Sequence, residues 1–228
     1  MGLTDILKAQ RDVFVIDKNI PYGKYVPLDL SENNKAISED LVSDSDEFGN
    51  YVNDFLTESD ALAAFGGYNE KRKLYKRSDL FQDDVEEERD IHIGLDIWTE
   101  AETPVLAALD GTVHGFDFNV GKGNYGPTII LKHHIEGNTF YTLYGHLSVE
   151  SIEDIEIGDS FKKGAEIGEL GDASVNGDYP PHLHFQIIID IEDNFGDYPG
   201  VCSESDRDFY LRNCPDPNLL LKIQHTNT

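Results

Sequence analysis

The stretch IHIGLDI at residues 91–97 decides the fold, together with HLHF at residues 182–185 far downstream. In both stretches apolar residues alternate with polar ones or glycine, which is typical of a β-strand with one face in the core. His92 and Asp96 are four residues apart, and His182 and His184 are two apart. Since side chains of a strand alternate between its faces, we expect each pair to lie on one face.

We expect the polar faces of these two strands to supply the ligands of a metal ion. Two imidazoles and a carboxylate, from His92, Asp96 and His184, are typical ligands of a zinc ion that keeps its fourth position open. An open position is a property of catalytic rather than structural zinc. The sequence therefore predicts one catalytic Zn²⁺ per chain, held by these three residues.

Hydrolysis at such a site also needs a group that accepts a proton from the attacking water or steadies the charge on the attacked carbonyl. His146 ends the segment YTLYGH at residues 141–146, in which Thr142, Tyr144 and His146 share a strand face. His182 faces the same way as His184. We therefore expect His146 and His182 to be the catalytic residues beside the metal, and which of them is the base stays open.

The remaining chain predicts a mainly β protein. Short apolar segments separated by Gly, Asn, Asp and Lys turns favour an antiparallel sheet folded on itself, with a sandwich-like core. The N-terminal extension is partly helical, with an amphipathic helix expected over 47–65 and ended by Gly66-Gly67. Residues 68–88 are expected to be loop-rich. The predicted strands are 91–97, 104–107, 111–118, 128–134, 140–146, 166–170 and 184–189.

Composition bears on partners and compartment rather than on fold. The 228 residues carry a formal net charge of −26, which disfavours nucleic acid and anionic membrane surfaces as partners. No apolar run approaches the ~20 residues of a membrane span, and residues 1–20 lack the apolar core of a secretory signal. We expect a cytoplasmic monomer as the sequence stands, and a periplasmic or extracellular one only if the chain is truncated. Whether Cys202 and Cys214 pair stays open.

Three motifs in this order resemble the lysostaphin/LytM-type zinc metallopeptidases: His-x-x-x-Asp at 92–96, Tyr-Gly-His-Leu-Ser at 144–148 and His-Leu-His-Phe at 182–185. The resemblance covers about residues 89–189. It implies a compact β core with a groove over one face, zinc ligands at His92, Asp96 and His184, and catalytic histidines at His146 and His182.

The resemblance also implies a substrate and a division of the chain. That family cleaves peptide bonds of bacterial peptidoglycan, so a peptide or peptidoglycan-like substrate is expected. The implied division is an extension over 1–88, a metallopeptidase-like β domain over 89–190 and a C-terminal tail over 191–228 packed on the core. A transition-state tyrosine is expected upstream, for which Tyr68 and Tyr75 are the candidates.

Three functions stay open at this point. The first is a zinc endopeptidase or amidase acting on peptidoglycan or a related peptide. The second, suggested by the acidic composition and the missing signal, is a zinc hydrolase of a small intracellular substrate derived from an amino acid. The third is a regulator whose groove binds a partner without catalysis. Four further histidines are interpreted as structural or without function: His133, His134 and His225 at the surface or in the tail, and His114 as a packing or hydrogen-bonding residue.

Overall fold

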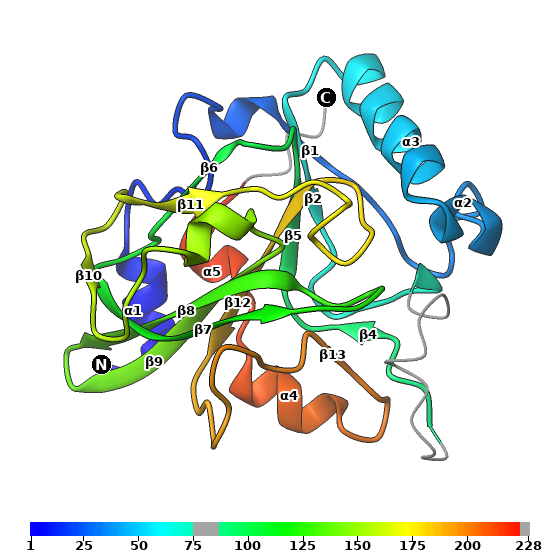
Figure 1. Cartoon of the computed structure of the whole chain (residues 1–228). Helices are drawn as coiled ribbons and strands as arrows, with labels where there is room; N and C mark the ends of the chain where they lie inside the picture. Colours follow the sequence, from blue (N-terminus) through cyan, green and yellow to red (C-terminus); the bar gives the residue numbers. More distant parts are fainter. Residues whose placement is uncertain (75–86, 224–228) are drawn as a thin grey trace.

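An eight-stranded sheet runs through the centre of the molecule in the computed structural model, which describes residues 1–74 and 87–223 (Figure 1). Apart from the parallel pair β1–β2, its neighbouring strands are antiparallel. The mainly β prediction is confirmed. In their order across the sheet the strands are β1 (Tyr25–Pro27), β2 (Ala63–Gly66), β5 (Leu95–Trp98), β12 (His182–Ile188), β9 (Asn138–Gly145), β8 (Gly126–Ile135), β7 (Gly111–Asn119) and β10 (Ser160–Phe161).

Two smaller sheets flank the large one within the described residues. One pairs β11 (Glu166–Glu169) with β6 (Pro104–Leu106), and the other has the order β13 (Val201–Cys202), β4 (Ile91–His92) and β3 (Glu70–Lys71). Six of the seven predicted strands match observed strands to within two residues at each end. The exception is the predicted strand over 91–97, which the structure divides between β4 and β5.

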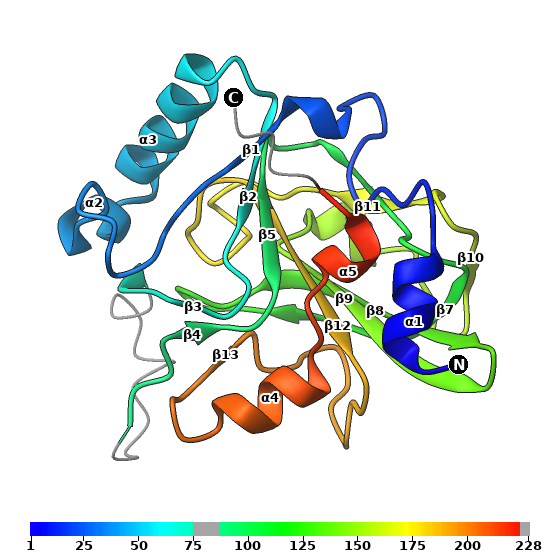
Figure 2. The same ribbon diagram turned by 180° about the vertical axis from the view of Figure 1, so that it is seen from behind.

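Strand β12 shows how the sheet separates core from site. Leu183, Phe185 and Ile187 are fully buried in the main hydrophobic cluster, whereas His182, His184 and Gln186 alternate with them. Helices α1 (Leu3–Ala9) and α5 (Asn218–Leu221) cover the apolar face (Figure 2). Both helices contribute leucines to this cluster. The opposite face of β12 is thereby left for the polar residues.

The long helix of the N-terminal part is α3 (Ser45–Glu58), which follows the short α2 (Glu39–Ser43). Asp44 caps α3, because its side chain accepts hydrogen bonds from the backbone N–H groups of Asp46 and Glu47, at 2.9 and 3.0 Å. The predicted helix over 47–65 was wrong at its end. Residues 63–66 form β2 instead, because Phe65 pairs with strand β5 and is buried in the main core. Burial between strands outweighed the helical spacing.

Segments outside the predicted β domain take part in the same sheets. Strands β1 and β2 extend the eight-stranded sheet, and β3 pairs with β4. After the sheet, β13 and α4 (Arg207–Asn213) pack against β4, in a cluster that buries both cysteines as free thiols. None of the helices in the described residues is long and apolar enough to cross a membrane.

Candidate metal centre and active site

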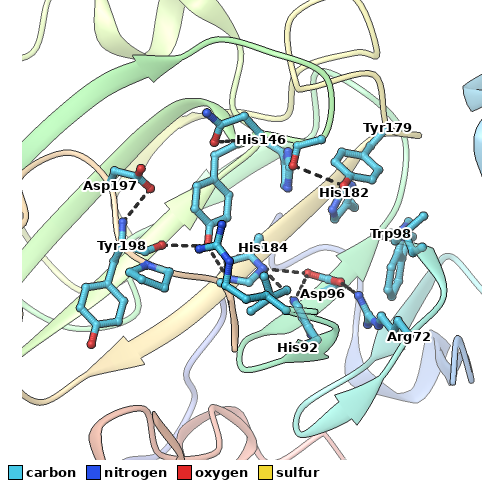
Figure 3. A pocket seen from close by; sticks show the side chains of 18 of the residues that line it. Arg72, His92, Asp96, Trp98, His146, Tyr179, His182, His184, Asp197 and Tyr198 are labelled. Carbon is cyan, nitrogen blue, oxygen red and sulfur yellow. Dashed lines mark hydrogen bonds and ion pairs between the residues drawn. The ribbon is translucent and has the colours of Figure 1, made fainter. Parts of the chain in front are cut away.

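Three predicted metal ligands meet at one point beside the eight-stranded sheet (Figure 3). His92 Nε2 lies 2.9 Å from His184 Nδ1 and 3.2 Å from Asp96 Oδ1, and His184 Nδ1 lies 3.1 Å from the same oxygen. All three side chains are buried. Donors bound at ~2.0–2.1 Å to a tetrahedral zinc lie roughly 3.3 Å apart, so this triangle has close to the dimensions that a single ion needs.

The backbone brings the donors together by a route that the sequence pattern did not predict. His92 belongs to β4 of the three-stranded sheet, whereas Asp96 belongs to β5 of the large sheet. The chain leaves one sheet for the other at Ile93-Gly94, so the expected alternation along one strand was wrong. The third donor is placed by register, since His184 of β12 is the direct partner of Asp96 in β5.

Gly94 makes room for the third donor. A Cβ atom at this position would lie 2.4 Å from Cε1 and 2.6 Å from Nε2 of His184, so the imidazole occupies the space of a missing side chain. The glycine at this turn between sheets is therefore required by the close approach of His184 to the backbone.

Hydrogen bonds at the rear of each imidazole leave its lone pair directed at the shared point. The Gly67 carbonyl accepts from His92 Nδ1 at 2.9 Å, so Nε2 of His92 carries no proton when the ring is neutral. Gln186 Nε2 donates to the Pro199 carbonyl at 3.1 Å, which turns Gln186 Oε1 toward His184 Nε2 at 2.9 Å. In neutral His184 the proton is therefore on Nε2, and Nδ1 presents a lone pair to the shared point as well.

Burial lowers the pKa of His92 to about 4, which keeps its ring neutral. Burial by itself raises the pKa of Asp96, but the Arg72 guanidinium, which donates to Oδ2, holds it well below its usual value. Two imidazole lone pairs and a carboxylate oxygen therefore converge about 3 Å apart, and acceptors so arranged are stabilised by a shared cation. The donor set fits a divalent metal with two nitrogen ligands and one oxygen ligand.

The two predicted catalytic histidines lie side by side near the three donors. The ring centroids of His146 and His182 are 4.1 Å apart, and that of His146 is 6.4 Å from His184. His146 Nδ1 donates to the Asn176 carbonyl and His182 Nδ1 to the Pro180 carbonyl, each at 2.8 Å. Each ring therefore has Nε2 as its basic atom.

Burial is also the main reason that the pKa of each of these histidines is lowered, to about 4 for His182 and well below the usual value for His146. Both rings are neutral near pH 7 and can accept a proton. His146 also has a left-handed backbone, with φ of 66°, directly after β9. Non-glycine residues in this conformation are uncommon, and strained backbone of this kind is concentrated at functional sites.

A cavity of about 270 Å³ is lined both by the three predicted metal ligands and by the two predicted catalytic histidines. Its volume is close to the lower end of the ~300–1,000 Å³ range of ligand pockets. The five predicted residues line it, together with residues that the sequence analysis did not single out, namely Phe48, Arg72, Leu74, Arg89, Trp98, Gly123, Asn124, Tyr125, Tyr179, Asn194, Asp197, Tyr198, Pro199, Gly200 and Val201.

The ring of Tyr125 packs against the ring of the predicted ligand His184, with centroids 5.0 Å apart. Its hydroxyl lies 3.4 Å from His184 Nε2 and donates to the Tyr198 carbonyl at 3.1 Å. The candidate Tyr68 instead donates to the Cys214 carbonyl at 2.7 Å and does not line the cavity, and Tyr75 lies outside the described residues. The Gly-rich turn over 121–126 before β8 was the signal that could have pointed to Tyr125.

The three other histidines within the described residues do not line the cavity. His133 is buried, not at the surface as predicted, because Nδ1 donates to the Asp110 carbonyl and Nε2 accepts from Thr142 Oγ1. His134 is exposed, as expected. His114 packs against Tyr141 and Phe195 rings, which confirms its packing role, and His225 lies outside the described residues.

Comparison with known proteins agrees with these observations. Residues 90–194 match the model of peptidase family M23. The chain is 34% identical over 99 residues to peptidoglycan DD-endopeptidase ShyC of Vibrio cholerae, and 33% identical over 98 residues to an uncharacterized metalloprotease of Haemophilus influenzae. Each match covers 43% of this chain but only 20% and 18% of those two relatives, respectively, so the chain spans about a fifth of their length.

Among solved structures, the catalytic domain of lysostaphin from Staphylococcus simulans is 21% identical, with a TM-score of 0.43, over 71% of this chain and 96% of that domain. The family model begins two residues before His92 and ends ten residues after His184, so it contains all five predicted site residues. Residues 90–194 of this chain are thus similar to the domain that defines peptidase family M23.

Proposed function

We propose that this protein is a zinc-dependent peptidase that hydrolyses a peptide bond of peptidoglycan. The observation that carries the proposal is the convergence of two imidazole lone pairs and a carboxylate oxygen within 3.2 Å of one another, beside two further neutral histidines. His92, Asp96 and His184 would hold the zinc. Its chemistry, when bound, is Lewis acidity toward water and toward the carbonyl of the substrate.

Zinc is favoured over other divalent ions by the donor types. Imidazole nitrogen and one carboxylate oxygen suit zinc, whereas magnesium and calcium prefer sites made of oxygen. The single carboxylate leaves the site with a net positive charge once a divalent ion is present. This charge is suited to polarising a carbonyl group.

His146 and His182 handle the protons in this proposal. Their Nδ1 atoms are engaged with backbone carbonyls, so only the Nε2 atoms are free to act as bases. One Nε2 accepts a proton from the attacking water, and the amine that leaves the broken peptide bond takes up a proton from the same pair. Neutral imidazoles in a buried cavity are suited to general base catalysis, which contributes roughly 10²–10⁴-fold to the rate.

The substrate class is supported by the relative from Vibrio cholerae, which is named for peptidoglycan endopeptidase activity. The site residues here are all present, which favours catalysis over a purely binding role. A net charge of −26 disfavours binding to anionic polymers, so the experiment compares sacculi with small amino-acid amides as substrates.

The test is digestion of purified peptidoglycan sacculi by the full chain, with soluble muropeptides separated by chromatography. We expect about one equivalent of zinc per chain, release of cross-linked fragments, and loss of both zinc and activity with a chelator. His184→Ala removes a ligand, and His134→Ala, at an exposed position, is the matched control. Activity retained in His184→Ala contradicts the proposal, and turnover of small amino-acid amides without attack on sacculi favours the small-substrate hydrolase.

A further inference from the structure

Arg72 lies outside the segment that matches the family, yet its guanidinium reaches the metal centre. It follows β3 directly and is only 2% exposed. Nη1 donates to Asp96 Oδ2 at 2.6 Å (Figure 3). Nε donates to Glu70 Oε2, also at 2.6 Å. The other carboxylate oxygen of Asp96 is the one that faces His92 and His184. Arg72 therefore binds Oδ2 of Asp96, while Oδ1 of the same carboxylate is the predicted metal ligand.

Gly67 leaves the space that the guanidinium of Arg72 occupies. A Cβ atom at Gly67 would lie 1.7 Å from Nη2 of Arg72, so any larger residue would exclude the guanidinium. The carbonyl of the same glycine accepts from His92 Nδ1 at 2.9 Å. Two of the three predicted ligands are thus oriented from the segment over 67–72, which precedes the family domain in the sequence.

Arg72 also contacts the residue that supports one catalytic histidine. Its Cζ atom lies 5.8 Å from the ring centroid of Trp98, and the Trp98 ring stacks on His182 with centroids 5.5 Å apart and planes at 16°. The guanidinium, the indole and the imidazole therefore form a continuous buried contact from Asp96 to His182. Movement of Arg72 would disturb both the ligand carboxylate and the catalytic ring.

We propose that Arg72 is a positioning residue that holds Asp96 Oδ1 in place for the metal, an inference that rests on the proposed zinc peptidase function. Held through Oδ2, Asp96 would offer a single oxygen, Oδ1, to the ion. Outer hydrogen-bond partners of this kind set ligand orientation, and their loss typically lowers metal affinity by about 10–100-fold.

The chemistry of arginine explains why this residue type is needed. Glu70 and Asp96 are two carboxylates on either side of one guanidinium, and its planar fork donates to both at once from different nitrogens. A lysine ammonium keeps the charge but is a single point donor. A methionine of similar length removes the charge and leaves the buried Asp96 and the partly buried Glu70 without it.

The experiment measures zinc affinity of the full chain by competition with a chromophoric chelator, together with the visible absorption of the Co²⁺-substituted protein. We expect zinc affinity to fall about 10–100-fold in Arg72→Met and less in Arg72→Lys, with a changed Co²⁺ spectrum in both. Lys71→Met is the matched control, because Lys71 pairs with Asp90 at 3.4 Å and does not line the cavity. Its zinc affinity and Co²⁺ spectrum should equal those of the wild type.

Circular dichroism confirms folding of each variant before the titration. If Arg72→Met does not fold, Arg72→Lys and Glu70→Gln carry the test, since Glu70→Gln keeps the arginine but weakens its second anchor. Wild-type zinc affinity and an unchanged Co²⁺ spectrum in the folded Arg72 variants would overturn the inference and leave the proposed function standing. A wild-type chain that binds no zinc would instead refute the proposed function itself.

Discussion

Gly94→Ala should strongly weaken the candidate metal centre without replacing any of its proposed ligands. The methyl group would lie 2.4 Å from Cε1 and 2.6 Å from Nε2 of His184, where ordinary contacts between such atoms are about 3.5 Å or longer. The imidazole must therefore move by about 1 Å. The position of Gly94 is outside the left-handed φ region, so an alanine is compatible with its backbone and the clash is the dominant effect.

A displacement of this size is large for a metal site. Ligand distances must hold to about 0.2 Å, and a misplacement of about 1 Å at a reacting centre can reduce a rate by 10²-fold. We therefore expect zinc affinity to fall by about 10²-fold or more, which is about 2.7 kcal/mol. Peptidase activity at limiting zinc should fall with it.

The assay is titration of the purified variant with zinc against a competing chelator, with thermal unfolding recorded with and without zinc. Wild-type protein should be stabilised by zinc, and Gly94→Ala much less so. Gly23→Ala is the control, because no atom lies within 4 Å of its added Cβ. Wild-type zinc affinity in Gly94→Ala would refute the reasoning from close approach.

Three further predictions concern the two proposed catalytic histidines, a buried histidine and a helix cap. Replacing His146 or His182 with Ala should lower kcat by about 10²–10⁴-fold while metal analysis still finds one equivalent of zinc, and loss of the zinc would contradict their assignment as proton carriers. Burial lowers the pKa of His133 to about 4, below the ordinary 6.5, so the folded protein binds fewer protons there than the unfolded chain. The stability from this residue is complete above pH 6.5 and lost as the pH falls toward 4, by about 3 kcal/mol in total. Urea unfolding at several pH values should therefore show a weaker acid dependence in His133→Gln than in wild type, whereas His134→Gln should match wild type; equal slopes in all three would be the contrary result. Asp44→Ala removes two cap hydrogen bonds of α3 and should lower the free energy of unfolding by about 1 kcal/mol in urea titration, with no change in zinc content; an unchanged stability would mean that the cap contributes nothing.

Local pattern was sufficient for most strands and for the residues that meet at the site. Alternation along residues 182–188 correctly assigned Leu183, Phe185 and Ile187 to the core and His182 and His184 to the opposite face. This worked because a strand buried on one side has a period of two whatever its partners are. The division of the chain at residues 88 and 190 stays a prediction.

Local pattern failed where a distant segment decided the outcome. Residues 63–66 continue a helical spacing, but pairing with β5 makes them a strand. Residues 91–97 alternate like one strand, but the chain passes from one sheet to another at Gly94. The imidazole of His184 occupies the space where a side chain at Gly94 would lie. His133 has an exposed neighbour and an ordinary sequence context, and only the Asp110 carbonyl and Thr142 explain its burial.

The sequence alone determined a mainly β fold and five residues with the chemistry of a metal-assisted hydrolase, since strand periodicity and ligand type are properties of the residues themselves. Only the tertiary structure decided how these residues are held. The approach of Arg72 to Asp96, of Gly67 to His92 and of Gln186 to His184 depends on segments that pairing brings together. Such contacts arise from the register between strands and from the space left by glycines, and neither leaves a period in the sequence.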